Sequence, residues 1–205
     1  MIDPNDYLDA ALLLHGHRCP AMPLGLRAGA AAMELLGVER SGGKTLEAIL
    51  ELGDGHCAHC FADGVQMITG CTFGKGNIRK LGYGKFGLTL VDRQTGRAVR
   101  VVPRAEAQLQ SKQTPFFTEY RMKGISPTEV PQAVVQPLID KVMAAPAEAL
   151  LRFGEITAWE VVGGDETFGS FVCARCGDMV VDRYARVVNG HTVCIPCEAA
   201  LHAPA

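Results

Sequence analysis

Four cysteines near the end of the chain form two C-x-x-C pairs with 17 residues between them: Cys173, Cys176, Cys194 and Cys197. Thiolates at this spacing form two knuckles that close a tetrahedral site around Zn²⁺. A segment of about 35 residues cannot bury a stabilising core unaided, so the metal supplies the folding energy. The second pair runs into the helix-forming stretch "EAALHA". We therefore predict a structural zinc finger of the treble-clef or ribbon type at residues 171–205. The alternative is a set of reduced, free cysteines.

The predicted finger carries balanced charge. Its three arginines are matched by three acidic residues: Arg175, Arg183, Arg186, Asp178, Asp182 and Glu198. A neutral module is a poor match for a phosphate backbone. A protein-docking or purely structural role is therefore favoured over nucleic-acid binding.

A second group of metal-ligand residue types lies in "HGHRCP" (15–20) and "GHCAHCFADGVQMITGCTFGKGN" (55–77). Its members are His15, His17, Cys19, His56, Cys57, His59, Cys60, Asp63 and Cys71. Imidazole and thiolate ligands together suit Zn²⁺ or another soft transition metal, and the set leaves room for an exchangeable ligand. The spacing of Cys60, Asp63 and Gln66 places them on one face of a helix.

Other interpretations of these residues stay open. A histidine on the apolar face of the first helix, such as His15, is often a packed core residue. Cys57 and Cys60 have the spacing of a thioredoxin-like redox pair, although the expected preceding strand is missing. Cys71 could be an inert buried thiol, and either Cys57 or Cys60 could be the metal ligand.

Helix and strand signals alternate along residues 1–162. Asp3-Pro4 starts a helix that ends at His15, and a second helix covers about 22–37, with Gly25 and Gly29 forming a small-residue patch for close backbone approach. The remaining signals predict a strand at 45–52, a helix at 58–68, strands over 77–84, 86–92 and 97–102, a hairpin turn at 94–96, a helix at 127–144 and strand again at 149–162. The glycine-rich break at 163–170 separates a core domain, 1–165, from the finger.

Composition limits the class of protein. Apolar residues make up 48% of the 205 residues, which is enough for a proper core, and the net charge of −2 points to no partner. No segment is apolar enough to span a membrane, and no basic region precedes the first apolar run. We expect a cytoplasmic protein that contacts no membrane.

Charge is unevenly distributed along the core domain. Residues 75–104 carry eight basic side chains against Asp92 alone, whereas residues 34–63 carry six acidic and two basic ones. A basic face could receive an anionic cofactor, an acidic partner or nucleic acid. Alternatively, the acidic side chains of residues 34–63 balance the positive charge of residues 75–104, and the basic face is simply solvated.

The motifs together resemble those of the FmdE family, named for a subunit of formylmethanofuran dehydrogenase. The resemblance rests on "HGHRCP" followed by a Gly/Ala-rich helix, on C-x-x-D-x-x-Q at 60–66, and on "GCTFGKGN" at 70–77. It covers about residues 10–160, and the finger is similar to one found in some members. Two departures are Ala21, where the family usually has glycine, and the extra Cys57.

The resemblance implies an α+β fold with a mixed β-sheet core packed with helices, a homodimer and a metal-binding cleft. It places His17, Cys19, Cys60 and Cys71 around the metal, which would be zinc or another transition metal. Beside the cleft it places His15 and a set of cofactor-binding residues: Asp63, Gln66, Thr72, Lys75 and Asn77.

The function implied by the resemblance is a metal-binding accessory or redox-associated subunit. It would work with partner subunits of a molybdenum or tungsten one-carbon oxidoreductase, as in methanogenesis. The chain does not resemble the subunit that carries the pterin cofactor, and it lacks the C-x2-C-x2-C-x3-C run of iron–sulfur proteins.

Two alternatives remain. One is a free-standing metalloenzyme in which the metal keeps an open position and Asp63 or a second histidine acts as general base. The other is a nucleic-acid-binding regulator, which the neutral finger disfavours.

Overall fold

The computed structural model describes residues 2–55, 59–161, 163 and 167–202. The chain divides into two compact units, Met1–Val161 and Val162–Ala205. The predicted break at 163–170 lies partly outside the described residues. Among the residues described, no helix has both the length and the apolar character needed to cross a membrane.

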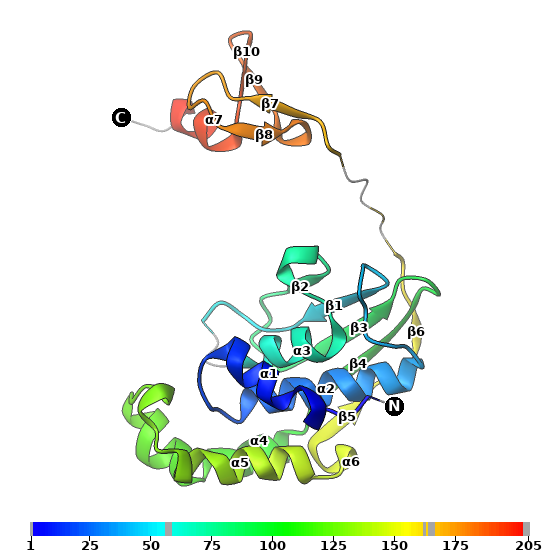
Figure 1. Ribbon diagram of the computed structural model, residues 1–205, viewed down its shortest axis with the longest axis vertical. Coiled ribbons are helices and arrows are strands. Elements are labelled where there is room, and N and C mark those ends of the chain that lie inside the picture. The colour runs from blue at the N-terminus through cyan, green and yellow to red at the C-terminus, as the bar shows by residue number, and fades with distance from the viewer. Residues whose placement is uncertain (1, 56–58, 162, 164–166, 203–205) are drawn as a thin grey trace. The chain divides into compact units, whose positions relative to one another are not determined.

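The first unit is built on a mixed sheet (Figure 1). Its strands are β1 (Leu46–Leu50), β2 (Ile78–Lys80), β3 (Leu88–Asp92), β4 (Arg97–Pro103), β5 (Leu151–Phe153) and β6 (Thr157–Ala158). The order is β2-β1-β3-β4-β5, with β6 also pairing with β4. The β1–β2 pair is parallel and the other pairs are antiparallel, so the predicted mixed sheet is confirmed.

The helices of this unit are α1 (Asn5–His15), α2 (Ala21–Leu36), α3 (Cys60–Thr69), α4 (Ala105–Lys112), α5 (Gln132–Ala144) and α6 (Ala147–Leu150). Short turns of other helix types lie at η1 (Phe73–Lys75), η2 (Phe116–Tyr120), η3 (Arg121–Lys123) and η4 (Pro127–Glu129). The helix predicted at 127–144 is divided into η4 and α5. Pro131 lies between them. Because proline has no backbone N–H, it cannot donate the hydrogen bond that would continue the helix from η4.

Helix α2 is buried on more than one side. Ala28, Met33 and Leu36 belong to a core cluster that includes residues of β1, β3 and β4. Met22 and Leu26 belong to a second cluster, which includes residues of α1 and α5. A helix that is apolar around most of its surface is expected in such a central position.

Helices α2 and α3 pack against each other through glycines. A Cβ atom added to Gly25 would lie 2.1 Å from the carbonyl oxygen of Phe61, and one added to Gly64 would lie 2.1 Å from that of Met22. At Gly29 the nearest atom, in the side chain of Ile68, would lie 2.3 Å away. The close-approach patch predicted at Gly25 and Gly29 is therefore confirmed.

The described residues of the second unit form short hairpins followed by a helix (Figure 1). Strands β7 (Ser170–Val172) and β8 (Met179–Val181) form the first hairpin. Strands β9 (Arg186–Val188) and β10 (His191–Val193) form the second, a turn η5 (Asp182–Tyr184) lies between the hairpins, and α7 (Ile195–His202) follows. The helix predicted after the second cysteine pair is confirmed, since Cys194 directly precedes α7 and Cys197 lies in its first turn.

Candidate metal centre

Four side chains of the first unit form a compact group of metal-ligand types. One ligand atom from each of His15, His17, Cys19 and Cys60 lies within 4.8 Å of the others. His15 is the last residue of α1, His17 and Cys19 lie in the connection to α2, and Cys60 is the first residue of α3. The site is therefore assembled where three helices meet.

Local backbone geometry explains this assembly. Gly16 ends α1 with a left-handed φ of 83°, a conformation that glycine adopts without strain, and its N–H is bonded to the carbonyl of Leu12. The chain then turns through His17 and Cys19, and α2 begins at Ala21. The glycine contacts between α2 and α3 bring the first turn of α3, with Cys60, beside the first turn of α2.

His15 is oriented by a carboxylate. Its Nδ1 lies 2.8 Å from Oδ2 of Asp63. Its Nε2 lies 3.1 Å from Nε2 of His17 and 3.6 Å from Sγ of Cys19, so that nitrogen faces the group. The hydrogen bond with Asp63 raises the pKa of His15 to about 9. Histidine ligands of metals commonly have such a carboxylate behind them.

The two thiols are electrostatically different. The pKa of Cys19 is lowered, first by the hydrogen bond from Cys60 and then by the backbone amides of Met22 and Ala21 at the start of α2. The pKa of Cys60 is raised, by the same bond to Cys19 and by burial. Cys19 is therefore the more acidic thiol of the pair, because backbone amides at the positive end of a helix dipole favour its ionised form.

The environment of His17 favours its neutral form. Burial lowers its pKa, and the positive charges of His15 and Arg121 lower it further. Histidine binds a metal through a neutral ring nitrogen and cysteine through a thiolate, so metal binding here would release protons from the group. Two nitrogen and two sulfur donors suit tetrahedral Zn²⁺. The residues present therefore fit a zinc-type ion.

Cys71, which was predicted as a ligand, is not part of this group. Its side chain is fully buried in the core cluster on the sheet side, and burial raises its pKa to about 11. The ring of His59 lies 2.9 Å from the carbonyl of Gly53 and also falls outside the group. His56 and Cys57 lie outside the described residues. The structure therefore describes Cys60 but not Cys57, the other candidate ligand of this pair.

The residues predicted to bind a cofactor hold a turn together. Thr72 Oγ1 accepts a hydrogen bond from the amide of Lys75, and Asn77 Oδ1 accepts one from the amide of Thr72. Asn77 Nδ2 donates to the carbonyl of Leu46, and Lys75 Nζ donates to that of Ser41. The structure gives each of these side chains a partner within the protein. Their cofactor-binding role stays a prediction.

The basic segment 75–104 is paired with the acidic one. Arg79 binds Glu47 at 2.9 Å, Lys80 binds Asp54 at 2.5 Å and Arg100 binds Glu51 at 2.5 Å. Arg104 donates to the carbonyl of Glu148. These contacts favour a balanced charge distribution over a basic binding face.

The four cysteines of the second unit also come together, each offering a sulfur within 4.8 Å of the others. The amide of Cys194 donates to Sγ of Cys173 at 3.3 Å. Backbone amides, that of Cys176 first, lower the pKa of Cys173 to about 6. A cysteine sulfur that accepts from backbone amides is typical of a zinc knuckle, and the four sulfurs together fit structural zinc.

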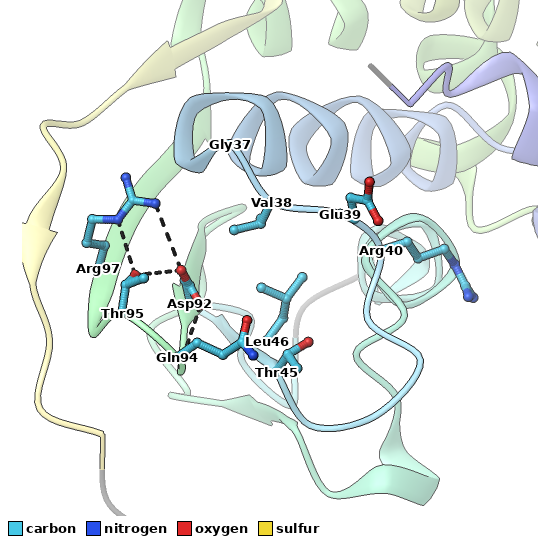
Figure 2. A pocket seen from close by; sticks show the side chains of 10 residues that line it. All are labelled: Gly37, Val38, Glu39, Arg40, Thr45, Leu46, Asp92, Gln94, Thr95 and Arg97. Atoms are coloured by element: carbon cyan, nitrogen blue, oxygen red, sulfur yellow. Dashed lines mark hydrogen bonds and ion pairs between the residues drawn. The ribbon is translucent and has the colours of Figure 1, made fainter.

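A polar pocket of about 450 Å³ lies between the end of α2, the start of β1 and the β3–β4 turn (Figure 2). Thr95 Oγ1 donates to Asp92 at 2.5 Å and accepts from Arg97 Nε at 3.2 Å. Arg97 also donates to the carbonyl of Leu36. Asp92, Thr95 and Arg97 are thus engaged within the protein, and none of the lining residues of the pocket belongs to either metal-ligand group.

Sequence reasoning did not foresee two features of the site. It left the participation of His15 open, and it did not anticipate that Asp63 and Gln66, which it placed beside a cofactor, form a hydrogen-bonded chain behind His15. The signal for this arrangement was present in the i, i+3 spacing of these two residues on α3.

An α+β unit with a His₂Cys₂ group at its helix ends, joined to a four-cysteine zinc finger, defines a metal-binding protein of two units. The chain belongs to the FmdE family: the family model described as "FmdE, Molybdenum formylmethanofuran dehydrogenase operon" matches residues 14–152. The prokaryotic dksA/traR C4-type zinc finger matches residues 166–201.

Two individual proteins are similar to the chain. A protein of Archaeoglobus fulgidus is described as a probable S-adenosyl-L-methionine-binding protein. It is 30% identical to this chain over an alignment 210 residues long, gaps included, which covers 92% of this chain and 51% of that protein. The chain therefore spans about half the length of this curated relative. The crystal structure of a tungsten formylmethanofuran dehydrogenase FmdE-like protein from Syntrophus aciditrophicus has a TM-score of 0.63 at 18% identity. The match covers 98% of this chain and 95% of that one. This structure supports the fold.

Proposed function

We propose that the chain is a metal-binding accessory subunit in which His15, His17, Cys19 and Cys60 hold one transition-metal ion, with Zn²⁺ as the first choice. The observation that carries the proposal is the convergence of these four ligand atoms within 4.8 Å. Membership of the FmdE family supports the link to a molybdenum or tungsten oxidoreductase.

The donor set favours an accessory centre over a free-standing metalloenzyme. When four protein ligands bind Zn²⁺, no position is left for water or substrate. Asp63, the candidate general base, is engaged by His15 and by Gln66. A carboxylate with both oxygens occupied is poorly placed to accept a proton from substrate.

The proposal includes a homodimer, oxidoreductase partner subunits and a cytoplasmic location. The family resemblance supports the first two. Thiolate ligands need a reducing compartment, which supports the third. Nucleic acid is disfavoured as a partner, because several basic side chains of residues 75–104 form ion pairs within the chain and the finger carries no net charge.

Metal analysis of the purified full chain tests the core centre. We expect two metal ions per chain, one of which is lost in His17→Ala and in Cys60→Ala and the other in Cys176→Ser. His191→Ala is the matched control, because this exposed histidine of the finger lies outside both groups and its removal should leave both ions in place. A single ion per chain that is lost with Cys176→Ser would contradict the proposal.

The oxidoreductase link needs a separate test. The tagged chain would be purified from its native cells, and the co-purifying fraction would be analysed for molybdenum and tungsten. Enrichment of either metal is expected. Absence of both from a fraction that contains the intact, zinc-loaded chain would contradict the link while leaving the metal centre in place.

A further inference from the structure

The side-chain amide of Gln66 connects two parts of the first unit. Its Nε2 donates a hydrogen bond to Oδ1 of Asp63 at 3.2 Å, and its Oε1 accepts one from the backbone N–H of Phe73 at 3.1 Å. Gln66 and Asp63 lie on α3, whereas Phe73 begins the turn η1. The amide therefore bridges the helix that carries Cys60 and the turn that follows it.

The chain of hydrogen bonds continues to the metal-ligand group. Oδ2 of Asp63, the oxygen that Gln66 does not contact, lies 2.8 Å from Nδ1 of His15. Nε2 of His15 then faces His17 and Cys19. A continuous path thus runs from the Phe73 amide through Gln66 and Asp63 to the inward-facing nitrogen of His15.

Each link of this path has a defined direction. A backbone N–H can only donate, so Oε1 of Gln66 must face Phe73, and the amide nitrogen must therefore face Asp63. A carboxylate oxygen can only accept, so Nδ1 of His15 donates to Asp63, and Nε2 is the nitrogen that would bind a metal in place of its proton. The backbone N–H of Phe73 therefore fixes which end of the Gln66 amide faces Asp63, and Asp63 fixes which nitrogen of His15 faces the metal-ligand group.

The turn at the start of the path has its own fixed points. Thr72, Lys75 and Asn77 hold its backbone, with Asn77 1% exposed. The side chain of Phe73 is 89% exposed and does not serve as an anchor. What the turn supplies to Gln66 is a rigidly held amide donor.

We propose that Gln66 is a positioning residue of the core metal centre, which fixes Asp63 and through it presents Nε2 of His15 to the metal. This inference rests on the proposed function. It differs from a purely structural role, in which Gln66 only attaches the turn to α3 and the metal centre is indifferent to its amide.

Two substitutions separate these roles. Gln66→Glu keeps an oxygen that can accept from Phe73 but removes the donor to Asp63, and it places a second carboxylate beside the first. Gln66→Met keeps the side-chain length and removes both bonds. Gln110→Glu and Gln110→Met are the matched controls, because Gln110 is exposed on α4.

Co²⁺ affinity is the main readout. The metal-free full chain is titrated at about pH 8, where carboxylates are ionised, and the weaker sulfur-to-cobalt absorption distinguishes the two-thiolate core site from the four-thiolate finger. We expect both Gln66 variants to lose about 10- to 100-fold in affinity at the core site, the range for residues that orient a metal ligand. The finger site and both Gln110 controls should be unchanged.

Amide hydrogen exchange of the metal-free protein is the second readout. Exchange at Phe73 should become faster in Gln66→Met and remain at the level of the unsubstituted protein in Gln66→Glu. Wild-type Co²⁺ affinity in Gln66→Glu, with exchange at Phe73 preserved, would overturn the positioning role and leave the proposed function standing. If the unsubstituted chain bound Co²⁺ only at the finger, the proposed function and this inference would both fail.

Discussion

The α-carbon of Gly25 lies so close to the carbonyl oxygen of Phe61 that an added Cβ atom would approach that oxygen to 2.1 Å. Phe61 directly follows Cys60, one of the four proposed ligands, and Gly25 lies in the second turn of α2, close to Cys19 in sequence. The contact therefore sets the distance between the two helix ends that carry the thiols. Backbone packing and ligand geometry are coupled at this point.

Gly25→Ala should weaken both the fold and the metal centre. The methyl group must displace the backbone of α3, because a carbonyl cannot rotate away as a flexible side chain can. We expect the free energy of unfolding to fall by about 1–3 kcal/mol, the usual cost of overpacking. The core metal should also be lost more readily to a chelator, measured by release from the full chain.

The control for this substitution is Gly42→Ala. No atom lies within 4 Å of a Cβ at Gly42, and its φ is not left-handed. Its stability should stay the same or rise by up to about 1 kcal/mol, through the loss of backbone freedom in the unfolded chain. Equal metal retention in both variants would show that the helix contact does not position the thiols.

The close approach of α2 and α3 could be predicted from sequence, because only glycine at positions 25 and 29 leaves room for a neighbouring backbone. The assembly of His17, Cys19 and Cys60 could be predicted only as a hypothesis. It depends on Gly16 and on the contact at Gly64, which bring together segments more than forty residues apart.

Cys71 shows why the remaining ligands could not be settled from spacing. The chain leaves α3 at Gly70, whose φ of 72° is left-handed and whose α-carbon packs against the carbonyl of Ser41. That turn directs Cys71 into the cluster that packs on the sheet. The segment 105–123 was missed for another reason: it buries Phe116 alone and carries no periodic apolar face that would predict its helices.

Glu51→Gln should reduce stability in a pH-dependent way. Arg100 donates two hydrogen bonds to Glu51, at 2.5 Å and 2.8 Å, and holds the pKa of this carboxyl below its ordinary value of 4.5. At about pH 7 the substitution should lower the free energy of unfolding by about 1.5–3 kcal/mol, the range for a hydrogen bond to a charged group.

The direction of the pH dependence follows from the lowered pKa. A carboxyl with a depressed pKa in the folded state contributes stability that is complete above its ordinary pKa and is lost as pH falls through the folded value. The difference in the free energy of unfolding between the unsubstituted chain and Glu51→Gln, measured by urea unfolding, should therefore become smaller below about pH 4.5. A gap that stays constant through this range would contradict the ion pair as its source.

Loss of zinc should unfold the finger without unfolding the first unit. The finger has little apolar core, with Cys173, Val193 and Cys194 as its buried members. The metal supplies about 10–16 kcal/mol in such sites. Cys176→Ser should therefore make the finger sensitive to limited proteolysis and leave a resistant fragment that ends near Val161. The finger of His191→Ala should stay resistant, and resistance of the finger in Cys176→Ser would show that metal does not hold it.

Cys71→Ala should leave the core metal in place and lower stability. The thiol is fully buried, and its removal leaves a small cavity that we expect to cost about 1–2 kcal/mol. Cys19→Ala is the informative comparison, because Cys19 is also buried but lies within the four-residue group, and it should lose the core metal. Metal analysis of both variants, at the same fraction of folded protein, distinguishes a cysteine that only packs in the core from one that binds the metal. Loss of the core metal in folded Cys71→Ala would return Cys71 to the ligand set and would require α3 and the turn after it to rearrange when metal binds.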